Sequence, residues 1–560
     1  MRKAVDLHVH STKSDGTMTP SELVKHAQEI GLTAFALTDH DSTDGLAEAV
    51  RAAQGTPVEV VPGIEFSTEY NGRDIHVLGY FFDYSSERFQ ERIHTFADAR
   101  DLRNQKMCSR LQDGGMDVPY EALREENPSA VITRAHFARY MTEHGITKSN
   151  AEAFQRYIGD DCPYFVPRRK ISPQMAVEFI LEFHGMPVLA HPLQYHLGKE
   201  MLEALVRDMK AKGLMGLECI YSKYSPADER ELEALAARCG LLPTGGSDYH
   251  GANKPGLEMG TGYDRKLYVP ESVLTAMKHR LFHTDEQTKI LFADLDGTLL
   301  DSKKKITPGT MECLKDWAAA GNLLVLHSGR ALFDVKHMRT ELGLGDLPGM
   351  YCGGYNGAEV YDCTRDVVMF REGIPFDSVR KIMDIADECG VYCQTYDDSG
   401  IVTRRETEET DYYRRWIKLE VRTADDVTQL LRTEPGKCIA IEIHDTAKLE
   451  VLRRRICTEM QGRVAAFYSN PNYLEIVSVY ASKGLAVQRL SRTLGISPQN
   501  TYAAGDSEND ISMLRAAGTG IAMCNGLPDL PALAAAADVI TESDNDHDGL
   551  VPVLRKAMGQ

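Results

Sequence analysis

Two sets of residues, one in each half of the chain, have the types and spacing needed for chemistry on phosphate esters. The first set consists of histidines and carboxylates, which begin with DLHVHS at residues 6–11 and end with GSDYHG at residues 246–251. The second set consists mainly of aspartates, which begin with DLDGT at residues 294–298 and end with GDSEND at residues 505–510. Two complete sets predict an enzyme with two active sites.

The first set has the composition of a metal centre. Imidazole nitrogens suit zinc, iron or manganese, and carboxylates can bridge neighbouring ions. His8 and His10 are two residues apart, so their side chains project from the same face of a strand. Two or three divalent ions held there would polarise a phosphate ester and lower the pKa of a bridging water. The candidate ligands are His8, His10, Asp15, His40, Glu65, His76, His191, Asp248 and His250.

The second set begins with two aspartates at the end of an apolar run. Asp294 directly follows residues 290–293, and Asp296 stands directly before Gly297. We expect Asp294 to attack phosphorus, because a carboxylate nucleophile divides phosphoryl transfer into two steps through an aspartyl-phosphate. Asp296 would then protonate the leaving oxygen and activate water.

Further residues complete this second constellation. Ser328 ends the run NLLVLHS, and its hydroxyl can donate to a phosphoryl oxygen, while Lys483 supplies a cation for the same oxygens. Carboxylate oxygens are hard ligands that suit Mg²⁺ rather than zinc. The predicted magnesium site therefore consists of Asp294, Asp296, Asp506 and Asp510.

The elements that position these residues follow from the apolar pattern. Apolar runs alternate with amphipathic helical stretches in the N-terminal half, which is typical of a parallel α/β fold. AFALTDHD, VEVVPGIE and GMPVLAHP each end in polar residues, where a barrel strand presents catalytic groups. Thr19 and Glu22 form a capping-box signal, and Gly31 predicts the end of that helix. The polar segment 279–289 predicts a domain junction.

Composition narrows the functional classes. A chain of 560 residues exceeds what a single core accommodates. The formal net charge of −19 argues against binding to long nucleic acid, which draws its affinity from clustered cations. The sequence has no apolar run of about 18 residues and no secretory leader, so we expect no membrane span and a cytoplasmic location. The 12 cysteines include no CxxC pair, which argues against a thiolate zinc site.

The N-terminal motifs resemble those of the PHP (polymerase and histidinol phosphatase) domain over residues 1 to about 285. The matching segments are HVHSTKSDG, TDHD, GIE, HVLGYF, LAHP and GSDYHG. The resemblance implies a distorted (β/α)7 barrel with a trinuclear metal centre. It further implies three ligand groups, namely His8, His10, Glu65 and Asp248 for the first ion, Glu65, His76 and His191 for the second, and Asp15, His40 and His250 for the third.

Shorter matches point to small PHP phosphatases that act on nucleoside 3',5'-bisphosphates, some relatives of which trim short RNA from the 5' end. The segments are TRAHFARYM, DARDLRNQKM, YFVPRRKIS and GLECIYSKYSP. By this resemblance Arg134 and His136 bind phosphate and Arg103 faces the substrate, on a helical insertion at about residues 90–165. The run RRK at residues 168–170 is equally compatible with a phosphate contact and with a solvated turn.

The C-terminal half resembles the Cof-type group of haloacid dehalogenase (HAD) phosphatases over about residues 288–560. The resemblance implies a Rossmann-like parallel sheet. It assigns Asp294 as the nucleophile, Asp296 as the acid–base group, and Ser328 with Lys483 as the phosphate-binding residues. It further assigns Asp506 with Asp510 to magnesium binding and Asn509 to the support of Lys483. HSGR departs from the usual Thr-Gly-Arg segment but keeps the hydroxyl.

The interval between Ser328 and Lys483 is longer than a crossover needs. An α/β cap at about residues 372–468, inserted after YNGAEVYD, would fill it, and such caps close over substrate and exclude water. YDDSGIVTRR and EPGKCIAIEIHD are predicted cap strands, and DSVRKIMDIADECG is a predicted helix. The pattern leaves sugar phosphates, nucleotides and cofactor phosphates open as substrates.

The sequence thus predicts an α/β protein in which a PHP barrel precedes a capped HAD domain, and a bifunctional metal-dependent phosphatase. The PHP half would use two to three Mn, Zn or Fe ions on nucleoside 3',5'-bisphosphates, and the HAD half would use Mg on a small phosphorylated metabolite. One alternative is a 5'-to-3' exoribonuclease on short RNA with the same metal centre. Another is that one domain only binds a phosphorylated ligand.

Overall fold

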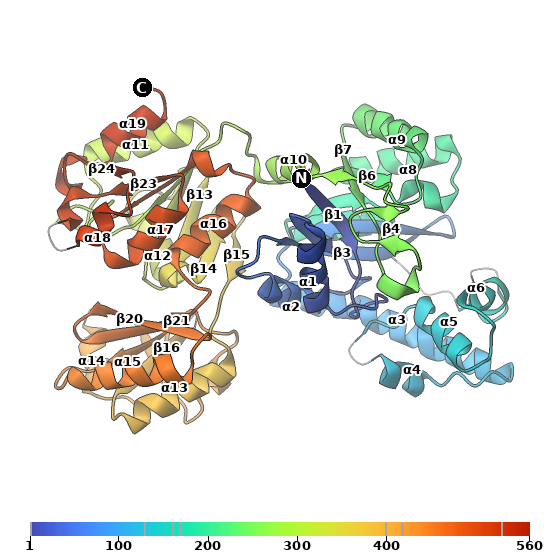
Figure 1. Ribbon diagram of the computed structural model, residues 1–560, viewed down its shortest axis with the longest axis horizontal. Helices are drawn as coiled ribbons and strands as arrows, with labels where there is room; N and C mark the ends of the chain where they lie inside the picture. The colour runs from blue at the N-terminus through green and yellow to red at the C-terminus, as the bar shows by residue number, and fades with distance from the viewer. Residues whose placement is uncertain are drawn as a thin grey trace. The chain divides into compact units, whose positions relative to one another are not determined.

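The computed structural model describes residues 3–127, 130–159, 162–166, 171–397, 400–415, 419–527 and 530–560, without the side chains of residues 96–99 and 470. The chain divides into two compact units, Met1–Leu281 and Phe282–Gln560, each of which is built from strands and helices (Figure 1). The run Arg168, Arg169 and Lys170, considered above as a phosphate contact or a solvated turn, lies outside the described residues. Among the described residues, no helix has the length and apolar character needed to cross a membrane.

The first unit is a closed and distorted barrel. Its strands follow one another in the sheet, β1 (Ala4–Val9), β2 (Ala34–Leu37), β3 (Glu59–Tyr70), β4 (Arg73–Tyr80), β5 (Met186–Leu189), β6 (Gly216–Tyr221) and β7 (Leu242–Gly246). The Asp248 N–H donates to the His8 carbonyl at 2.9 Å and the His10 N–H donates to the Tyr249 carbonyl at 2.9 Å, which joins the end of β7 to β1. β4 runs antiparallel to both neighbours, and this departure from an all-parallel barrel is the distortion that the family resemblance implied.

Helices that follow the strands pack on the barrel. They are α1 (Pro20–Ile30), α2 (Leu46–Ala52), α7 (Pro173–Glu182), α8 (Lys199–Ala211), α9 (Pro226–Cys239) and α10 (Glu271–Phe282). Helix α1 begins as predicted, because Thr19 accepts from the Glu22 N–H while Glu22 accepts from the Thr19 N–H. Gly31 ends it with φ 78°, a left-handed conformation that glycine adopts without strain. β10 (Val269–Pro270) adds an antiparallel edge to β1.

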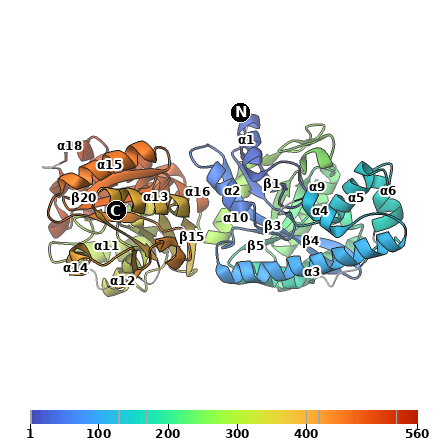
Figure 2. The ribbon, with the colours of Figure 1, turned by 90° about the horizontal axis from the view of Figure 1, so that it is seen from below.

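A helical insertion separates β4 from β5. It contains α3 (Glu87–Asp113), α4 (Tyr120–Glu126), α5 (Arg134–Glu143), α6 (Asn150–Ala153) and a π-helical turn at Phe154–Ile158. The long helix α3 runs beneath the barrel strands in Figure 2. The insertion has a small core of its own around Met107, Leu111 and Phe137, which stabilises it as a separate layer beside the barrel.

The second unit is built around a mostly parallel sheet. The order is β15 (Val367–Arg371), β14 (Glu359–Asp362), β13 (Met350–Gly354), β12 (Leu323–His327), β11 (Ile290–Ala293), β22 (Thr501–Gly505), β23 (Thr519–Ala522) and β24 (Val539–Ile540). β11 lies between β12 and β22 and parallel to both, so residues that follow these three strands meet at one edge. β14 and β15 run antiparallel and lead the chain out of the sheet.

The chain between β15 and helix α16 (Lys483–Thr493) forms a cap with its own sheet. Its strands are ordered β18 (Glu420–Thr423), β17 (Gly400–Thr403), β16 (Tyr392–Asp397), β19 (Cys438–Ile441), β21 (Tyr473–Ser478) and β20 (Val464–Asn470). Helices α13 (Phe376–Glu388) and α15 (Ala447–Glu459) pack on one face of this sheet. The predicted strands and helix of this region agree with β16, β17, β19 and α13. The cap sheet extends to Ser478 rather than to about residue 468, because Val464–Ser478 forms a hairpin whose second strand pairs with β19.

Candidate active sites

Glu65 lies at the centre of a cluster of histidines inside the barrel. One carboxylate oxygen, Oε2, is 3.2 Å from ring nitrogens of His8, His10 and His40. The other oxygen, Oε1, is 2.8 Å from Nδ1 of His76 and 3.0 Å from Nε2 of His191. Both oxygens of Glu65 therefore lie among ring nitrogens, and its role as a ligand shared by two ions stays a prediction.

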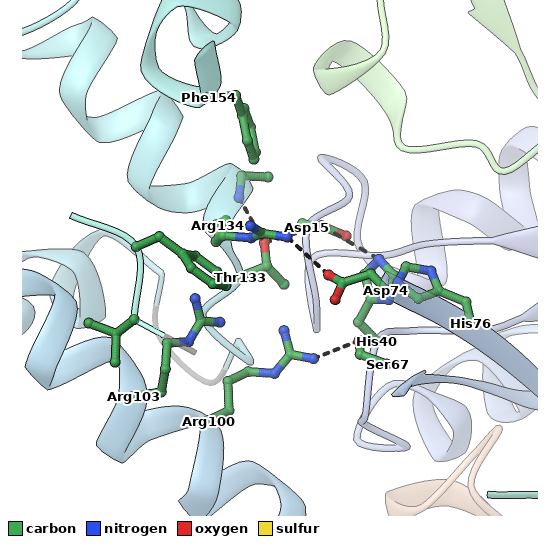
Figure 3. A pocket seen from close by; sticks show the side chains of 13 residues that line it. Asp15, His40, Ser67, Asp74, His76, Arg100, Arg103, Thr133, Arg134 and Phe154 are labelled. Carbon is green, nitrogen blue, oxygen red and sulfur yellow. Dashed lines mark hydrogen bonds and ion pairs between the residues drawn. The ribbon is translucent and has the colours of Figure 1, made fainter. Parts of the chain in front are cut away.

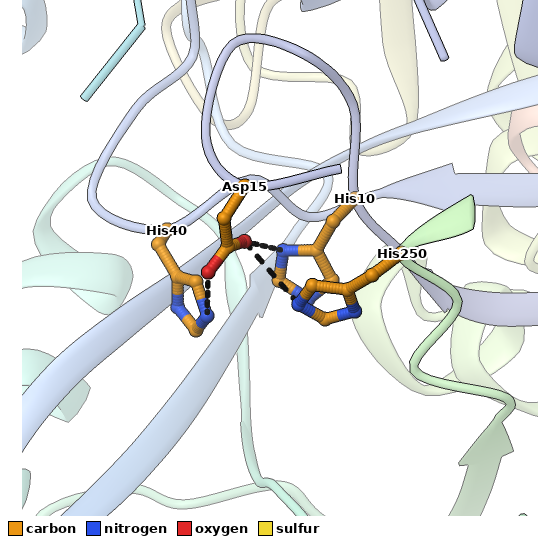
Figure 4. Close-up of side chains that lie close together, drawn as sticks. All are labelled: His10, Asp15, His40 and His250. Carbon is orange, nitrogen blue, oxygen red and sulfur yellow. Dashed lines mark ion pairs between the residues drawn. The ribbon is translucent and has the colours of Figure 1, made fainter. Parts of the chain in front are cut away.

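Asp15 gathers a second part of the cluster (Figure 4). Its Oδ1 is 3.2 Å from His250 Nε2 and 3.9 Å from His10 Nδ1, and its Oδ2 is 3.8 Å from His40 Nε2. Ligand atoms of these four residues lie within 4.8 Å of one another, which is the span of a single metal ion's coordination sphere. The structure therefore brings Asp15, His40 and His250 together as predicted, and adds His10 to them.

Asp248 completes the cluster next to His8 and His10. Its Oδ1 is 3.7 Å from His8 Nε2 and 3.5 Å from His10 Nε2. Its Oδ2 accepts from the Tyr221 hydroxyl at 2.7 Å and from Lys254 Nζ at 2.5 Å. These two donors fix the rotamer of Asp248 and leave Oδ1 directed at the histidines.

Glu218, which was absent from the sequence-based candidates, orients two of the histidines. It lies on β6, is 1% exposed, and contacts His8 Nδ1 at 3.0 Å with Oε1. Its Oε2 accepts from the His191 N–H at 2.7 Å. A carboxylate that accepts from Nδ1 leaves Nε2 of His8 as the lone-pair nitrogen that faces the cluster. The alternation of GLECIY could have indicated a polar side chain inside the barrel.

The cluster has the chemistry of a site for divalent cations. Within the described part of the chain, buried atoms without a hydrogen-bond partner include His8 Nε2, His10 Nε2, His40 Nδ1, Glu65 Oε2 and Asp15 Oδ1. Nearly all buried polar atoms are paired in folded proteins, so five convergent unpaired atoms indicate that a ligand satisfies them. The residues present therefore fit a metal centre.

The electrostatics of the cluster agree with this assignment. Burial would raise the pKa of Glu65, but the surrounding histidines, led by His76, hold it well below its usual range. Burial lowers the pKa of His40 to about 3, so this ring is neutral and can act as a ligand. Burial also opposes protonation of His10, yet Asp248 and Glu65 raise its pKa to about 9. The carboxylates therefore favour the presence of positive charge in this cluster.

A cavity of about 180 Å³ opens beside the cluster (Figure 3). His40, His76 and Asp15 line it on the barrel side, and the helical insertion lines it on the other side with arginines. Arg103 and Arg134, two of the predicted substrate contacts, are among these arginines. A pocket with arginines on one wall and candidate metal ligands on the other is suited to an anionic ester.

Two further residues change the prediction for this pocket. Arg100, absent from the sequence-based candidates, lines it as well, donates to Asp41, and contacts the Ser67 hydroxyl at 2.9 Å. His136 does not line it and is 3% exposed. His136 Nδ1 instead accepts from the Thr133 N–H at 2.9 Å and so caps α5. The sequence did not indicate Arg100 as a pocket residue, because α3 contains many other charged residues.

The second site lies at the carboxyl edge of β11, β12 and β22. Lys483, the first residue of α16, places Nζ 2.5 Å from Asp294 Oδ1 and 2.6 Å from Asp510 Oδ1. All three side chains are at most 9% exposed. Burial and the neighbouring Asp510 raise the pKa of Asp294 to about 7 despite the opposing effect of Lys483. The structure thus brings the predicted nucleophile and the predicted cation into direct contact.

The other predicted aspartates lie around this pair. The Asp506 carboxylate accepts from the Thr298 hydroxyl at 2.9 Å, and burial raises its pKa to about 6. Gly297 has φ 81° and its Cα faces Asp506 so closely that a Cβ there would collide with the carboxylate. Asp296 accepts from Lys304 at 2.6 Å and from Arg330 at 2.9 Å. Burial is offset by these cations, which lower the pKa of Asp296.

Comparisons with known proteins agree with the two sites. Residues 6–156 match the model of the PHP domain, and residues 291–554 match the model of the haloacid dehalogenase-like hydrolase. A 5'-3' exoribonuclease of Haemophilus influenzae is 33% identical over 250 residues, which cover 45% of this chain and 91% of that protein. This chain belongs to the PHP family in its first half and to the HAD family in its second.

Two further comparisons cover one domain each. A 3',5'-nucleoside bisphosphate phosphatase of Chromobacterium violaceum is 32% identical over 257 residues, which cover 46% of this chain and 90% of that protein. A crystal structure of a haloacid dehalogenase-like hydrolase from Bacteroides thetaiotaomicron has 30% identity and a TM-score of 0.43, and it covers 48% of this chain and 99% of that chain. Both families consist of metal-dependent phosphoesterases, so the protein is a phosphoric ester hydrolase with two active sites.

Ser328 and Asn509 lie around the HAD site in different ways. Ser328 follows β12, and its hydroxyl accepts from the Arg330 N–H at 3.3 Å. Asn509 donates to Asn356 Oδ1 at 2.9 Å, and its Oδ1 accepts from the Ser507 hydroxyl at 2.6 Å, whereas the Lys483 ammonium donates to Asp294 and Asp510. Asn356 in turn donates to the cap residue Glu475 at 3.2 Å. A chain of hydrogen bonds therefore connects the aspartate loop after β22 to the cap of the HAD domain.

Lys437 gives the cap a second connection to the same edge. Its Nζ is 3.2 Å from Glu475 Oε2 and donates to the Gly329 carbonyl at 3.2 Å. Gly329 directly follows Ser328, and Lys437 is only 5% exposed. Lys437 and Glu475 were not among the sequence-based candidates, because the residues before and within a cap strand carry no motif.

Proposed function

We propose that the PHP domain, residues 1–285, hydrolyses one phosphate of nucleoside 3',5'-bisphosphates, and that the HAD domain, residues 288–560, dephosphorylates a small metabolite. We assign substrate selection to the helical insertion at about residues 90–165 and to the cap. The observation that carries the proposal is the position of Glu65, whose two oxygens face five histidines beside a pocket lined with arginines. The relative from Chromobacterium violaceum supports the choice of substrate.

In the PHP domain the protein's own residues hold and orient the ester. Arg103 and Arg134 would bind the phosphate that is not hydrolysed, because guanidinium groups match phosphate oxygens in a bidentate manner. We propose two to three Mn, Zn or Fe ions on the nine predicted ligands. These ions would supply the positive charge and the acidic water that phosphate hydrolysis needs. Glu218 would keep His8 in one tautomer, and Lys254 would keep Asp248 in one rotamer.

In the HAD domain Asp294 would attack phosphorus, and the bond between phosphorus and the leaving oxygen would break. Asp296 would give its proton to that oxygen and then take a proton from the water that hydrolyses the aspartyl-phosphate. This second step releases phosphate and restores the Asp294 carboxylate. The Lys483 ammonium partly neutralises the negative charge next to Asp294. Asp294, Asp296, Asp506 and Asp510 would hold one Mg²⁺, which would add positive charge opposite the phosphoryl oxygens.

The proposal is tested by phosphate release from 3'-phosphoadenosine 5'-phosphate and from a panel of sugar phosphates. Wild type is compared with Asp248→Ala and Asp294→Asn. We expect hydrolysis of the bisphosphate to be lost only in Asp248→Ala, and hydrolysis of the sugar phosphate to be lost only in Asp294→Asn. A wild-type protein that cleaves no bisphosphate, or an Asp248→Ala variant that still cleaves it, would contradict the assignment of the PHP domain.

A second candidate function for the PHP domain is removal of nucleotides from the 5' end of short RNA. The relative from Haemophilus influenzae, which carries that name, favours it. The same assay with a 5'-phosphorylated oligoribonucleotide separates the two, because an exoribonuclease releases mononucleotides whereas a bisphosphate phosphatase releases inorganic phosphate. We also propose small phosphorylated metabolites as the partners and the cytoplasm as the location.

A further inference from the structure

The pocket of the PHP domain changes in character with distance from the metal-ligand cluster. Candidate ligands form one wall and arginines lie next to them, whereas the remaining lining includes Phe154, Phe165 and Val166 (Figure 3). Phe154 and Phe165 are only partly buried. Partly exposed aromatic faces inside a polar pocket indicate a ligand with a flat apolar part.

Phe165 forms a flat surface together with Arg134. The Arg134 guanidinium lies over the Phe165 ring, with its central carbon 5.2 Å from the ring centroid. Arg134 is held in place by Asp74, whose Oδ2 accepts at 3.0 Å. Phe154 begins the π-helical turn and packs against the core of the insertion, so its backbone position is fixed. The aromatic wall is therefore anchored at both ends.

We propose that Phe165 and Phe154 form the binding site for a nucleobase, with the Arg134 guanidinium held against one face of the Phe165 ring, an inference that rests on the proposed function of the PHP domain. A phosphate at the metal cluster and a second phosphate at the arginines would leave the base as the one flat apolar group of the substrate. Bases stack on aromatic rings and on guanidinium planes. Stacking reads no hydrogen-bond pattern, so the site accepts all four bases with similar affinity.

The test compares substrates that differ only in the base. Wild type, Phe165→Leu and Phe165→Trp are assayed with 3'-phosphoadenosine 5'-phosphate and with ribose 3,5-bisphosphate, which lacks the base. Leucine keeps apolar volume but removes the aromatic face, so we expect KM for the nucleotide to rise about fivefold with kcat unchanged, and tryptophan to restore it. KM for the sugar bisphosphate should not change. Tyr157→Leu is the matched control, because Tyr157 packs on the same small core and is not part of the pocket lining.

A binding measurement separates this inference from the proposed function. Calorimetry with adenosine 5'-phosphate and ribose 5-phosphate needs no turnover. We expect wild type to prefer the nucleotide and Phe165→Leu to lose that preference. Equal losses for both ligands, or none, would overturn the base site even if bisphosphates are hydrolysed. If bisphosphates are not hydrolysed but the preference is present, the base site stands and the reaction is wrong. A 5'-phosphorylated dinucleotide shows whether the base of an RNA end uses the same site.

A second inference concerns two cysteines in the HAD sheet. Cys352 on β13 and Cys363, one residue after β14, are diagonal neighbours across the two antiparallel strands, and their sulfur atoms are 3.5 Å apart. Cys352 is buried, whereas Cys363 is partly exposed. The hydrogen bond with Cys352, together with the nearby Arg339 and Lys336, lowers the pKa of the Cys363 thiol despite its burial. An accessible thiol with a second thiol next to it is the arrangement of a reversible oxidation site.

We propose that a peroxide oxidises Cys352 and Cys363 to a disulfide. The Cys363 thiolate would attack the peroxide and become a sulfenic acid as the O–O bond breaks and hydroxide leaves. The Cys352 thiol would then displace the second oxygen as water, so that one hydrogen peroxide and two thiols give one disulfide and two waters. Cys352 directly precedes Gly353, whose carbonyl accepts from the Ser328 N–H at 2.9 Å. A disulfide would pull β13 toward Cys363 and would therefore displace Ser328, which lies at the predicted phosphate-binding edge of the sheet.

Hydrogen peroxide treatment of the full chain, followed by alkylation and peptide mass spectrometry, tests this pair. We expect a peptide pair that joins Cys352 to Cys363, two hydrogen masses lighter than the free peptides, and its disappearance after treatment with dithiothreitol. Cys457, which is exposed, serves as the reference thiol. Oxidation of Cys457 without that peptide pair would overturn the proposal. In an Asp248→Ala chain assayed with p-nitrophenyl phosphate, peroxide should lower the rate at least fivefold, and Cys363→Ser should resist it.

Discussion

The Lys483 ammonium lies 2.5 Å from the Asp294 carboxylate and 2.6 Å from the Asp510 carboxylate, in a place where all three groups are buried. Two carboxyl groups therefore share one ammonium group away from water. Removing one partner of a buried charge pair leaves an uncompensated charge, which costs more than the pair itself contributes. This relationship ties the stability of the HAD domain to Lys483, the predicted phosphate-binding lysine.

Lys483→Met should affect both properties. We expect HAD phosphatase activity to fall at least 100-fold and the HAD domain to lose about 3 kcal/mol of unfolding free energy, because Asp294 and Asp510 would face each other without a cation. Activity of the PHP domain on the bisphosphate should be unchanged. Urea unfolding combined with both assays measures these effects. Lys381→Met, which changes a half-exposed lysine on α13, is the control. Loss of activity at full stability would show that the ammonium acts on substrate alone.

Glu65→Gln should remove more metal from the PHP cluster than Asp15→Asn. Both oxygens of Glu65 face histidines, whereas Asp15 serves one group of ligands. We expect elemental analysis to find at least one ion fewer per chain in Glu65→Gln than in Asp15→Asn, after both proteins are loaded with Mn²⁺. Treatment of wild type with a chelator should lower the thermal midpoint of the PHP domain and leave bisphosphate hydrolysis undetectable. Equal metal content in the two variants would contradict the bridging role of Glu65.

The sequence singled out the side chains that cluster in the barrel better than the residues that support them, for a physical reason. Ligands such as His191 stand at the ends of apolar runs, so the local pattern alone places them at one edge of the barrel. Glu218 lies inside an apolar strand, and which way it points depends on the closure of the whole barrel. Arg100 stands among other charged residues of a long helix, where only the tertiary contact with Asp41 sets it apart. The hairpin at Val464–Ser478 extended the cap because strand pairing is a long-range contact.

His136, a predicted phosphate contact, has a second role in the fold as an acceptor at the start of α5. Burial lowers the pKa of His136 to about 4, and its Nδ1 accepts from the Thr133 N–H. An unfolded histidine has a pKa of about 6.5, so the unfolded state binds more protons between these values. The PHP domain should therefore lose stability as pH falls from about 6.5 to 4, by at most about 3 kcal/mol from this group.

Urea unfolding of wild type and His136→Gln across this pH range measures the contribution. Glutamine can still accept from the Thr133 N–H but does not titrate, so the variant should show a weaker pH dependence and stability close to wild type near pH 7. Other histidines of the cluster add their own pH dependence, and the difference between the two proteins isolates His136. Identical slopes for both proteins would show that His136 is not held neutral in the folded state. A large rise in KM for the bisphosphate at pH 7 would instead support the predicted phosphate contact.

Glu218→Gln should slow the PHP reaction without removing the metal centre. The amide preserves the size of the side chain but weakens the acceptor opposite His8 Nδ1, so the His8 ring is less firmly held with Nε2 toward the cluster. Loss of such a supporting carboxylate typically costs about 10- to 100-fold in activity or metal affinity. We expect kcat to fall in that range, with KM for the bisphosphate and HAD activity unchanged. Glu203→Gln, which alters a surface ion pair on α8, is the matched control. Elemental analysis and assays at increasing Mn²⁺ concentration decide the cause. If Glu218 positions His8, kcat stays low even at saturating Mn²⁺. If excess Mn²⁺ fully restores the rate, Glu218 contributes only to the affinity of the site for the metal.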